Sequence, residues 1–279
     1  MSDINQTNQT NHQRKIQVAA VQMVSTPNPA ENCETAARLV REAAAAGAQL
    51  VLLPEYWAVL GGGEHDKVEI AEPAGDGPLQ NFLAKLAREC GIWLLGGTLP
   101  LKSHQSGKVL NSLMAYAPDG TLATRYDKIH LFGFTRGEES YDESRTIVPG
   151  SEVAVLETPF ARVGLSICYD LRFPELYRAM GQCDLIVMPA AFTATTGRAH
   201  WEVLLRARAI ENQCYLLAAA QGGQHPNGRR TWGHSMLVDP WGAVCGQLAE
   251  GEGLLTGEID LDSMMGIRAS LPALQHRTL

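Results

Sequence analysis

RVGLSICYDLRFPELYRAMGQCDLIVMPAAF, residues 162–192, is the stretch that decides the fold class of this chain. It holds two apolar runs, at 162–170 and 183–192, separated by FPELYRAMGQ. Apolar runs of this kind are typical of strands buried on both faces, and the segment between them favours a short helix. The stretch therefore predicts strands that lie in a sheet covered by helices.

The rest of the chain repeats this alternation. Further strands are expected at 16–23, 49–55, 92–99, 214–221 and 253–261. Helices are expected at 28–47, 78–90 and 198–213; the first has an Asn28-Pro29 start signal and a closing Gly47. Strand pairs are expected around the turns at 118–120 and 239–242. The pattern predicts one layered α/β domain over residues 16–272, between a disordered polar tail at 1–15 and a tail at 273–279.

Composition and charge exclude several classes of function. The 279 residues are 45% hydrophobic and 19% charged, which is typical of a globular protein. The formal net charge is -7, and without a Lys/Arg cluster a nucleic-acid partner is not expected. No apolar stretch is long enough to span a bilayer, and the polar N-terminus lacks the apolar core of a signal peptide. We therefore expect a cytoplasmic protein with no membrane partner.

Six cysteines are spread along the chain without any C-x-x-C pair, so the usual zinc spacing is absent and no metal is expected. In a cytoplasm they should be reduced thiols. Five of them are expected to be small buried hydrophobic side chains: Cys33, Cys90, Cys183, Cys214 and Cys245. The sixth, Cys168, ends an apolar strand and is followed at once by Tyr-Asp-Leu-Arg.

Two further charged residues lie at the ends of apolar strands, where α/β domains gather reactive groups. Glu55 ends VLLPE, and Lys128 follows a strand in RYDKIHLF. Taken singly, the glutamate is a surface charge, the lysine a solvated side chain, and Cys168 a packed thiol. Taken together, the three residues are a base, a cation and a nucleophile.

These three side chains suit nucleophilic attack on an amide. A thiol with a pKa of about 8.5 is mostly protonated at pH 7, so it needs a neighbouring base or cation. Glu55 can accept the proton, while Lys128 can stabilise both the thiolate and the oxyanion that forms on the attacked carbonyl. The backbone N–H of Tyr169 is a second expected oxyanion donor. No histidine is needed in this arrangement.

Several longer motifs identify a family. LLPEYW, YDKIHLF, SICYDLRFPELYR, MPAAFT, GRAHWEVLLRARAIENQCYLLAAAQ and HSMLVDPWG occur in an order that resembles the carbon–nitrogen hydrolase (nitrilase) superfamily over nearly the whole chain. The resemblance implies a four-layer αββα sandwich of two mixed sheets. It also implies that Cys168 is the nucleophile, Glu55 the general base and Lys128 the oxyanion stabiliser, with no cofactor.

Family members also use a second glutamate in the loop after the lysine, here FGFTRGEESYDESRT. Glu143 matches best, with Glu138 and Glu139 as competitors; the alternative for each is a solvated loop charge. The resemblance places a carboxylate-binding arginine at Arg172, for which an ion pair with Asp170 or Glu175 is the alternative. The residues expected to bind substrate are Tyr169, Arg172, Phe192 and Thr193.

Within the superfamily the chain resembles the branch that acts on small amides of carboxylic acids. The expected substrates are deaminated glutathione or an ω-amide such as α-ketoglutaramate, cleaved through a thioester with release of ammonia. Nitriles and N-carbamoyl amino acids are alternatives within the superfamily. A catalytically silent binding or scaffold protein and a redox-sensing thiol protein are alternatives of other classes. The resemblance also implies a homodimer or higher homo-oligomer, assembled through the segments at 173–182 and 198–213.

Overall fold

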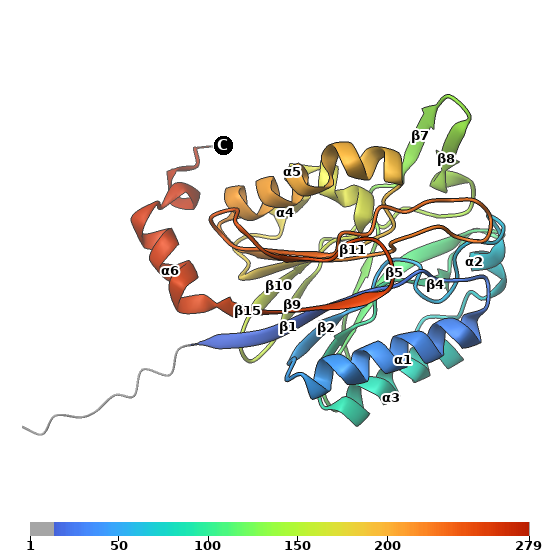
Figure 1. Ribbon diagram of the computed structural model, residues 1–279, viewed down its shortest axis with the longest axis horizontal. Helices are drawn as coiled ribbons and strands as arrows, with labels where there is room; N and C mark the ends of the chain where they lie inside the picture. Colours follow the sequence, from blue (N-terminus) through green and yellow to red (C-terminus); the bar gives the residue numbers. More distant parts are fainter. Residues whose placement is uncertain (1–13, 279) are drawn as a thin grey trace, which may run out of the picture.

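The computed structural model describes residues 14–278, which form two β-sheets packed face to face with helices outside (Figure 1). The first sheet runs in the order β15 (Gly253–Asp260), β1 (Lys15–Gln22), β2 (Leu50–Leu52), β3 (Trp93–Leu95), β5 (Val109–Tyr116) and β4 (Leu99–Lys102), and β6 (Leu122–Asp127) also pairs with β5. The second runs in the order β14 (Val244–Gln247), β13 (Met236–Val238), β12 (Tyr215–Ala220), β11 (Leu185–Ala190), β10 (Arg162–Leu165) and β9 (Val155–Glu157).

Each sheet is mixed, with parallel strands at its centre. Strands β1, β2 and β3 pair in parallel, as do β10, β11 and β12, while the outer strands pair antiparallel. Helix α4 (Pro174–Ala179) connects β10 to β11. The strand–helix–strand unit predicted from residues 162–192 is therefore confirmed, with shorter strands than the apolar runs.

Helices cover the outer face of each sheet and complete the four layers. Figure 1 shows α1 (Pro29–Ala45) and α3 (Pro78–Cys90) on the first sheet, with α4 and α5 (Ala194–Asn212) on the second. The described chain is thus the αββα sandwich that the sequence led us to expect. None of the helices between residues 14 and 278 is long and apolar enough to cross a membrane.

Strand β1 shows why two cores form. Its buried residues alternate: Val18 and Ala20 join the core that includes the space between the sheets, while Ala19 and Val21 join the core under α1 and α3. Because side chains alternate along a strand, an unbroken apolar run fills both faces. Strand β1 meets β12 across the interface, so the two sheets pack directly on one another.

Four features differ from the expectations. Strand β1 begins at Lys15, inside the predicted tail, whose other residues up to 13 lie outside the described part. Helix α6 (Leu261–Ser270) follows β15, with the Asp260 carboxylate accepting from the N–H groups of Asp262 and Ser263, and a 3₁₀ turn at Ala273–His276 lies in the predicted C-terminal tail. Helix α5 begins before residue 198. Of the five cysteines expected to be buried, Cys245 is exposed on β14 and Cys33 and Cys90 are only half-buried.

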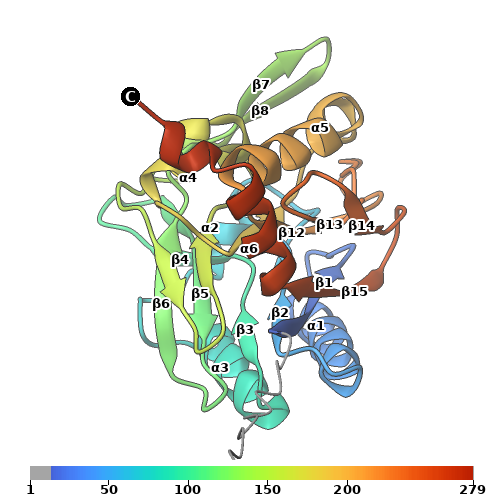
Figure 2. The ribbon, with the colours of Figure 1, turned by 90° about the vertical axis from the view of Figure 1, so that its left-hand side faces the viewer.

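A two-stranded hairpin was also not expected from the sequence. Strands β7 (Gly133–Arg136) and β8 (Glu139–Asp142) project beyond both sheets beside the start of α5, as Figure 2 shows from the side. Its alternating residues are largely polar or exposed, so the usual apolar signal of a strand is weak. The Thr195 hydroxyl of α5 donates to the Glu139 carboxylate at 2.7 Å and ties the hairpin to the helix.

Candidate active site

Glu55 lies just past β2, on a loop held by the neighbouring loop after β3. Gly97 has φ +56°, and a Cβ there would lie 2.1 Å from the Pro54 carbonyl oxygen, so only glycine permits this approach. The next residue, Thr98, accepts a hydrogen bond from the Tyr56 N–H at 2.9 Å. These contacts on either side of Glu55 fix the position of its backbone.

The Glu55 carboxylate is completely buried and accepts hydrogen bonds on both oxygens. Its Oε1 atom lies 2.9 Å from Lys128 Nζ and 2.9 Å from Asn111 Nδ2. Its Oε2 atom accepts from the Ala191 N–H at 2.9 Å. Donors from both sheets therefore converge on one carboxylate, which compensates for the loss of water.

Lys128 follows β6 and is completely buried between two carboxylates. Its Nζ atom lies 2.8 Å from Glu143 Oε2 in addition to its contact with Glu55. Glu143 begins the 3₁₀ helix η1 (Glu143–Arg145) and also accepts from the Tyr56 hydroxyl at 2.7 Å and the Phe132 N–H at 2.7 Å. Among the three candidate loop acids it is the one that contacts the lysine.

The other two acids lie elsewhere. Glu138 is exposed at the hairpin turn, and Glu139 accepts from the Thr195 hydroxyl. Both residues are on the rim of a larger cavity and make no recorded contact with Lys128. The sequence of this loop did not distinguish the three acids. The structure does, because η1 places Glu143 next to Lys128.

Cys168 is the first residue of the 3₁₀ helix η2 (Cys168–Arg172) and has φ +49°. A side-chain-bearing residue in this left-handed region is uncommon and marks a strained turn. The neighbouring Asp170 holds the turn: its buried carboxylate accepts from the Ile167 N–H at 2.9 Å and the Tyr126 hydroxyl at 2.7 Å. Cys168 is 6% exposed, and the nearby Glu55 carboxylate contributes to raising the pKa of its thiol.

A small cavity of about 10 Å³ adjoins the thiol. It brings together residues from five segments of the chain, and its lining is Glu55, Phe132, Glu143, Cys168, Ala191, Phe192, Thr193, Thr196 and Arg229. Glu55, Cys168 and Glu143 therefore face one space, and the Lys128 ammonium pairs with both glutamates.

The electrostatics of this cluster keep the lysine charged and the thiol neutral. Burial by itself would lower the pKa of Lys128, but the carboxylates of Glu143 and Glu55 outweigh it and raise that pKa. Burial raises the pKa of Cys168 well above its usual value; Glu55 adds to this rise, and Lys128 only partly opposes it. The resting group is therefore a thiol beside a carboxylate that can accept its proton.

The four expected substrate-binding residues divide into two pairs. Phe192 and Thr193 line the cavity at Cys168, and Thr193 Oγ1 also accepts from the Thr196 N–H at 3.2 Å, which caps α5. Tyr169 and Arg172 do not line it. The Arg172 guanidinium lies over the Tyr169 and Phe192 rings, with Nη1 3.2 Å from His200 Nδ1.

The alternative explanation of Arg172 as half of an ion pair does not match its contacts. Asp170 is fully engaged with Ile167, Tyr126 and His130, and within the described part of the chain no carboxylate lies within ion-pair distance of Arg172. Its role in binding stays a prediction.

Four residues of this region were not expected from the sequence. Asn111 and Tyr56 hydrogen-bond the two glutamates, and Arg229 and Lys67 line the space outside them. Tyr56 directly follows Glu55, so its neighbourhood was visible in the sequence. The other three come from segments whose proximity depends on the tertiary fold.

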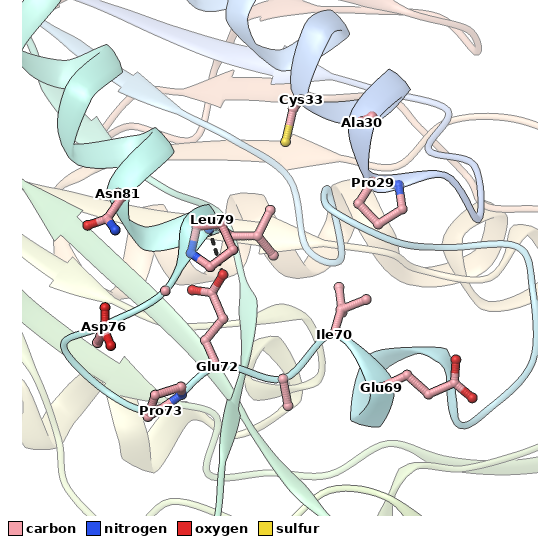
Figure 3. A pocket seen from close by; sticks show the side chains of 13 residues that line it. Pro29, Ala30, Cys33, Glu69, Ile70, Glu72, Pro73, Asp76, Leu79 and Asn81 are labelled. Carbon is pink, nitrogen blue, oxygen red and sulfur yellow. Dashed lines mark hydrogen bonds between the residues drawn. The ribbon is translucent and has the colours of Figure 1, made fainter.

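A cavity of about 790 Å³ lies away from Cys168, against the starts of α1 and α3 (Figure 3). It shares no lining residue with the cavity at Cys168. Figure 3 shows Glu72 pointing toward the start of α3, where it accepts from the Leu79 and Gln80 N–H groups. This carboxylate serves as a helix cap, and although the Cys33 thiol also lines the cavity, no lysine is among the lining residues.

Comparisons with known proteins bear on this geometry. The family model described as carbon-nitrogen hydrolase matches residues 17–269. The chain belongs to the carbon–nitrogen hydrolase family. The deaminated glutathione amidase of Homo sapiens is 42% identical over 93% of this carbon–nitrogen hydrolase and 81% of its own length. The omega-amidase NIT2 of Xenopus tropicalis is 40% identical over 94% of this chain and 95% of its own.

A solved structure shows the same fold. Saccharomyces cerevisiae Nit3, described as a member of branch 10 of the nitrilase superfamily, superposes with a TM-score of 0.86 at 30% identity, covering 95% of this chain and 97% of its own. The carbon–nitrogen hydrolase described here is accordingly an amidase, a hydrolase of carbon–nitrogen bonds other than peptide bonds, and it acts on a small-molecule amide.

Proposed function

We propose that this amidase cleaves deaminated glutathione, or an ω-amide such as α-ketoglutaramate, through a thioester on Cys168. One observation carries the mechanism: the thiol, the Glu55 carboxylate and the Lys128–Glu143 ion pair occupy one buried cluster beside a cavity. The names of the human and Xenopus relatives support the choice of substrate.

The first half of the reaction acylates the cysteine. Glu55 takes the Cys168 proton as the sulfur attacks the amide carbon, which is necessary because the resting thiol is neutral. The oxyanion accepts hydrogen bonds from Lys128 and the Tyr169 N–H. The lysine has three donor hydrogens, so two can remain on the carboxylates while the third reaches the oxyanion. Collapse of the tetrahedral intermediate breaks the C–N bond, and protonated Glu55 gives its proton to the departing nitrogen.

The second half releases the acid. Glu55, again ionised, removes a proton from a water molecule that attacks the thioester carbon. The C–S bond breaks, the proton returns to sulfur, and the enzyme regains its thiol. Glu143 does not take part in these transfers; it keeps Lys128 charged and in place through two oxygen contacts. No metal or organic cofactor is needed for these steps.

The leaving group depends on the substrate. α-Ketoglutaramate is a primary amide and releases ammonia, as expected from the sequence. In deaminated glutathione the scissile nitrogen belongs to a cysteinylglycine unit, so the product is that dipeptide. The release of ammonia therefore applies only to the first substrate. Both reactions yield α-ketoglutarate, which provides a common assay.

The test of this function compares Cys168→Ala and Cys168→Ser with the unchanged enzyme. We expect α-ketoglutarate release from both substrates to disappear in both variants, because alanine has no nucleophilic atom and the serine hydroxyl, which would form an ester, is a much weaker nucleophile than the thiol. Thermal unfolding of each variant shows that the fold is retained. Turnover that persists in Cys168→Ala would rule out the mechanism.

We also propose a homo-oligomer that buries the outer face of α5. Val203 on this helix is 65% exposed, and Ile210, seven residues later on the same face, is also exposed. Trp241 on the adjacent β13–β14 turn is 63% exposed, and Arg206 Nε ties that turn to α5 by donating to the Gly242 carbonyl. Such an apolar group is typical of an interface.

The assembly is tested by light scattering after size-exclusion chromatography. Val203→Glu should dissociate the oligomer, because a charge would then be buried in the interface. Val153→Glu, at an exposed position away from α4 and α5, is the matched control. A monomeric unchanged protein, or equal behaviour of the two variants, would reject this face. The cytoplasmic location stays a prediction from the sequence.

A further inference from the structure

A second cavity adjoins the one at Cys168 and is much larger. It has a volume of about 430 Å³ and shares Phe132, Glu143 and Arg229 with the inner cavity. The inner space of about 10 Å³ holds no more than one water molecule, whereas ligand pockets usually measure about 300–1,000 Å³. A substrate attached to Cys168 must therefore extend into the outer cavity.

Arg229 forms part of the wall between the two spaces and lacks an anionic partner. One Nη2 hydrogen goes to the Ala191 carbonyl at 2.9 Å, and the guanidinium lies over the Tyr141 ring at 5.1 Å. Its Nε atom is buried without any hydrogen-bond partner, and within residues 14–278 no carboxylate lies within ion-pair distance. A buried donor left unsatisfied in this way indicates a missing acceptor.

Lys67 in α2 (Asp66–Glu69) is a second cation on the same cavity. Its Nζ atom donates to the Glu64 carbonyl at 2.8 Å and to Thr146 Oγ1 at 3.1 Å, both of which are neutral. Burial lowers the pKa of Lys67; the charges of Glu143, Glu64 and Asp66 oppose this, and that of Arg229 adds to it. Both cations line the same cavity.

The acids around this cavity are engaged with other groups. Glu143 pairs with Lys128, Glu64 with Arg145, and Glu139 with the Thr195 hydroxyl. Asp66 accepts from the Gly63 N–H, and Asp142 accepts from the Ser144 N–H and hydroxyl. The remaining acid on the rim, Glu138, is exposed to water. None of them supplies the anion that the cation pair lacks.

We infer that Lys67 and Arg229 bind a carboxylate on the leaving-group side of the substrate. The enzyme then prefers amides whose nitrogen carries a short chain ending in a carboxylate over primary amides. This inference rests on the proposed function and chooses between its two substrates. In a two-residue leaving group the terminal carboxylate lies about 7 Å from the scissile nitrogen. Glu143 and Arg229 border both spaces, so a group departing past them enters the outer cavity.

Three substrates show whether Lys67 and Arg229 contact the leaving group or the acyl group. They are deaminated glutathione, the same compound with its glycine carboxylate converted to a carboxamide, and α-ketoglutaramate. In the unchanged enzyme kcat/KM should be about 10- to 100-fold higher for the carboxylate than for the carboxamide, as expected of a charge-assisted contact. In Lys67→Met and Arg229→Gln this ratio should approach one. Lys85→Met, on an exposed lysine of α3, should keep it.

The outcomes are distinct. A ratio near one in the unchanged enzyme, or a ratio that survives in both variants, would overturn the inference. So would an equal loss on all three substrates, because that result places the cations on the acyl side. Release of α-ketoglutarate from the carboxamide reports the proposed function separately. Calorimetric binding of deaminated glutathione to Cys168→Ala, with and without Lys67→Met, needs no turnover; equal affinities would also overturn the inference.

Discussion

Lys128 Nζ lies 2.9 Å from Glu55 Oε1, although the two residues are 73 positions apart and neither side chain is in contact with solvent. A buried ion pair is costly to desolvate and is retained where its charges have a use. Here Glu55 and the Cys168 thiol line one small cavity, and the same carboxylate contributes to raising the pKa of the thiol. The buried Glu55–Lys128 pair costs desolvation free energy, but it is well suited to hold a carboxylate base and an ammonium oxyanion donor in place.

Replacing Glu55 by Gln should remove the proton acceptor while keeping a side chain of the same size. We expect kcat to fall by about 10²- to 10⁴-fold, the usual contribution of general acid–base catalysis. The α-ketoglutarate assay measures this, and Glu89→Gln, at an exposed ion pair with Arg41, is the control. A loss of less than tenfold would mean that another group accepts the proton.

The pH dependence of Cys168 alkylation follows from its raised pKa. A group with a raised pKa stays protonated to higher pH, so labelling by iodoacetamide should still be increasing above pH 9. Because Glu55 contributes to the rise, Glu55→Gln should shift the curve to lower pH. Intact mass measures the label, and Cys168→Ala identifies the background. A curve that is already level at pH 7 would contradict a neutral resting thiol.

The position of Glu143 predicts a difference between neighbouring acids. Glu143→Gln removes one of the two carboxylates that hold Lys128 charged, so we expect a 10- to 100-fold loss of kcat, equivalent to about 1.4–2.7 kcal/mol. Glu139→Gln breaks only the contact with Thr195 and should change kcat by less than about threefold. Steady-state kinetics of the two variants provide the test. Comparable losses in both would remove the distinction drawn from the structure.

Thr193 combines a place in the cavity wall with a helix cap. Thr193→Ala should lower the free energy of unfolding by about 1 kcal/mol, because the Thr196 N–H loses its acceptor. Thr193→Ser retains the hydroxyl and should recover most of this loss in urea unfolding. If KM rises in the alanine variant but not in the serine variant, the hydroxyl also contributes to substrate binding. Unchanged stability in both variants would argue against the cap.

The sequence alone was sufficient for the alternation of strands and helices, and it singled out three residues that the structure brings together. Apolar runs such as 183–192 are local signals, since a strand buried on both faces needs apolar residues throughout. Glu55, Lys128 and Cys168 each lie in a motif several residues long, and each motif ends a predicted strand. The hairpin at 133–142 and the start of α5 at Ala194 lacked signals of comparable strength.

Only the tertiary structure decided which groups meet. It selected Glu143 from three nearby acids, brought Asn111 to Glu55, and placed Lys67 and Arg229 on one cavity. It also keeps the Cys168 thiol protonated, because burial and a nearby carboxylate outweigh the lysine. The sequence pattern indicates which side chains lie at the ends of strands. Charge state and partner choice depend on burial and on distances of a few ångströms, and these are set when the two sheets pack together.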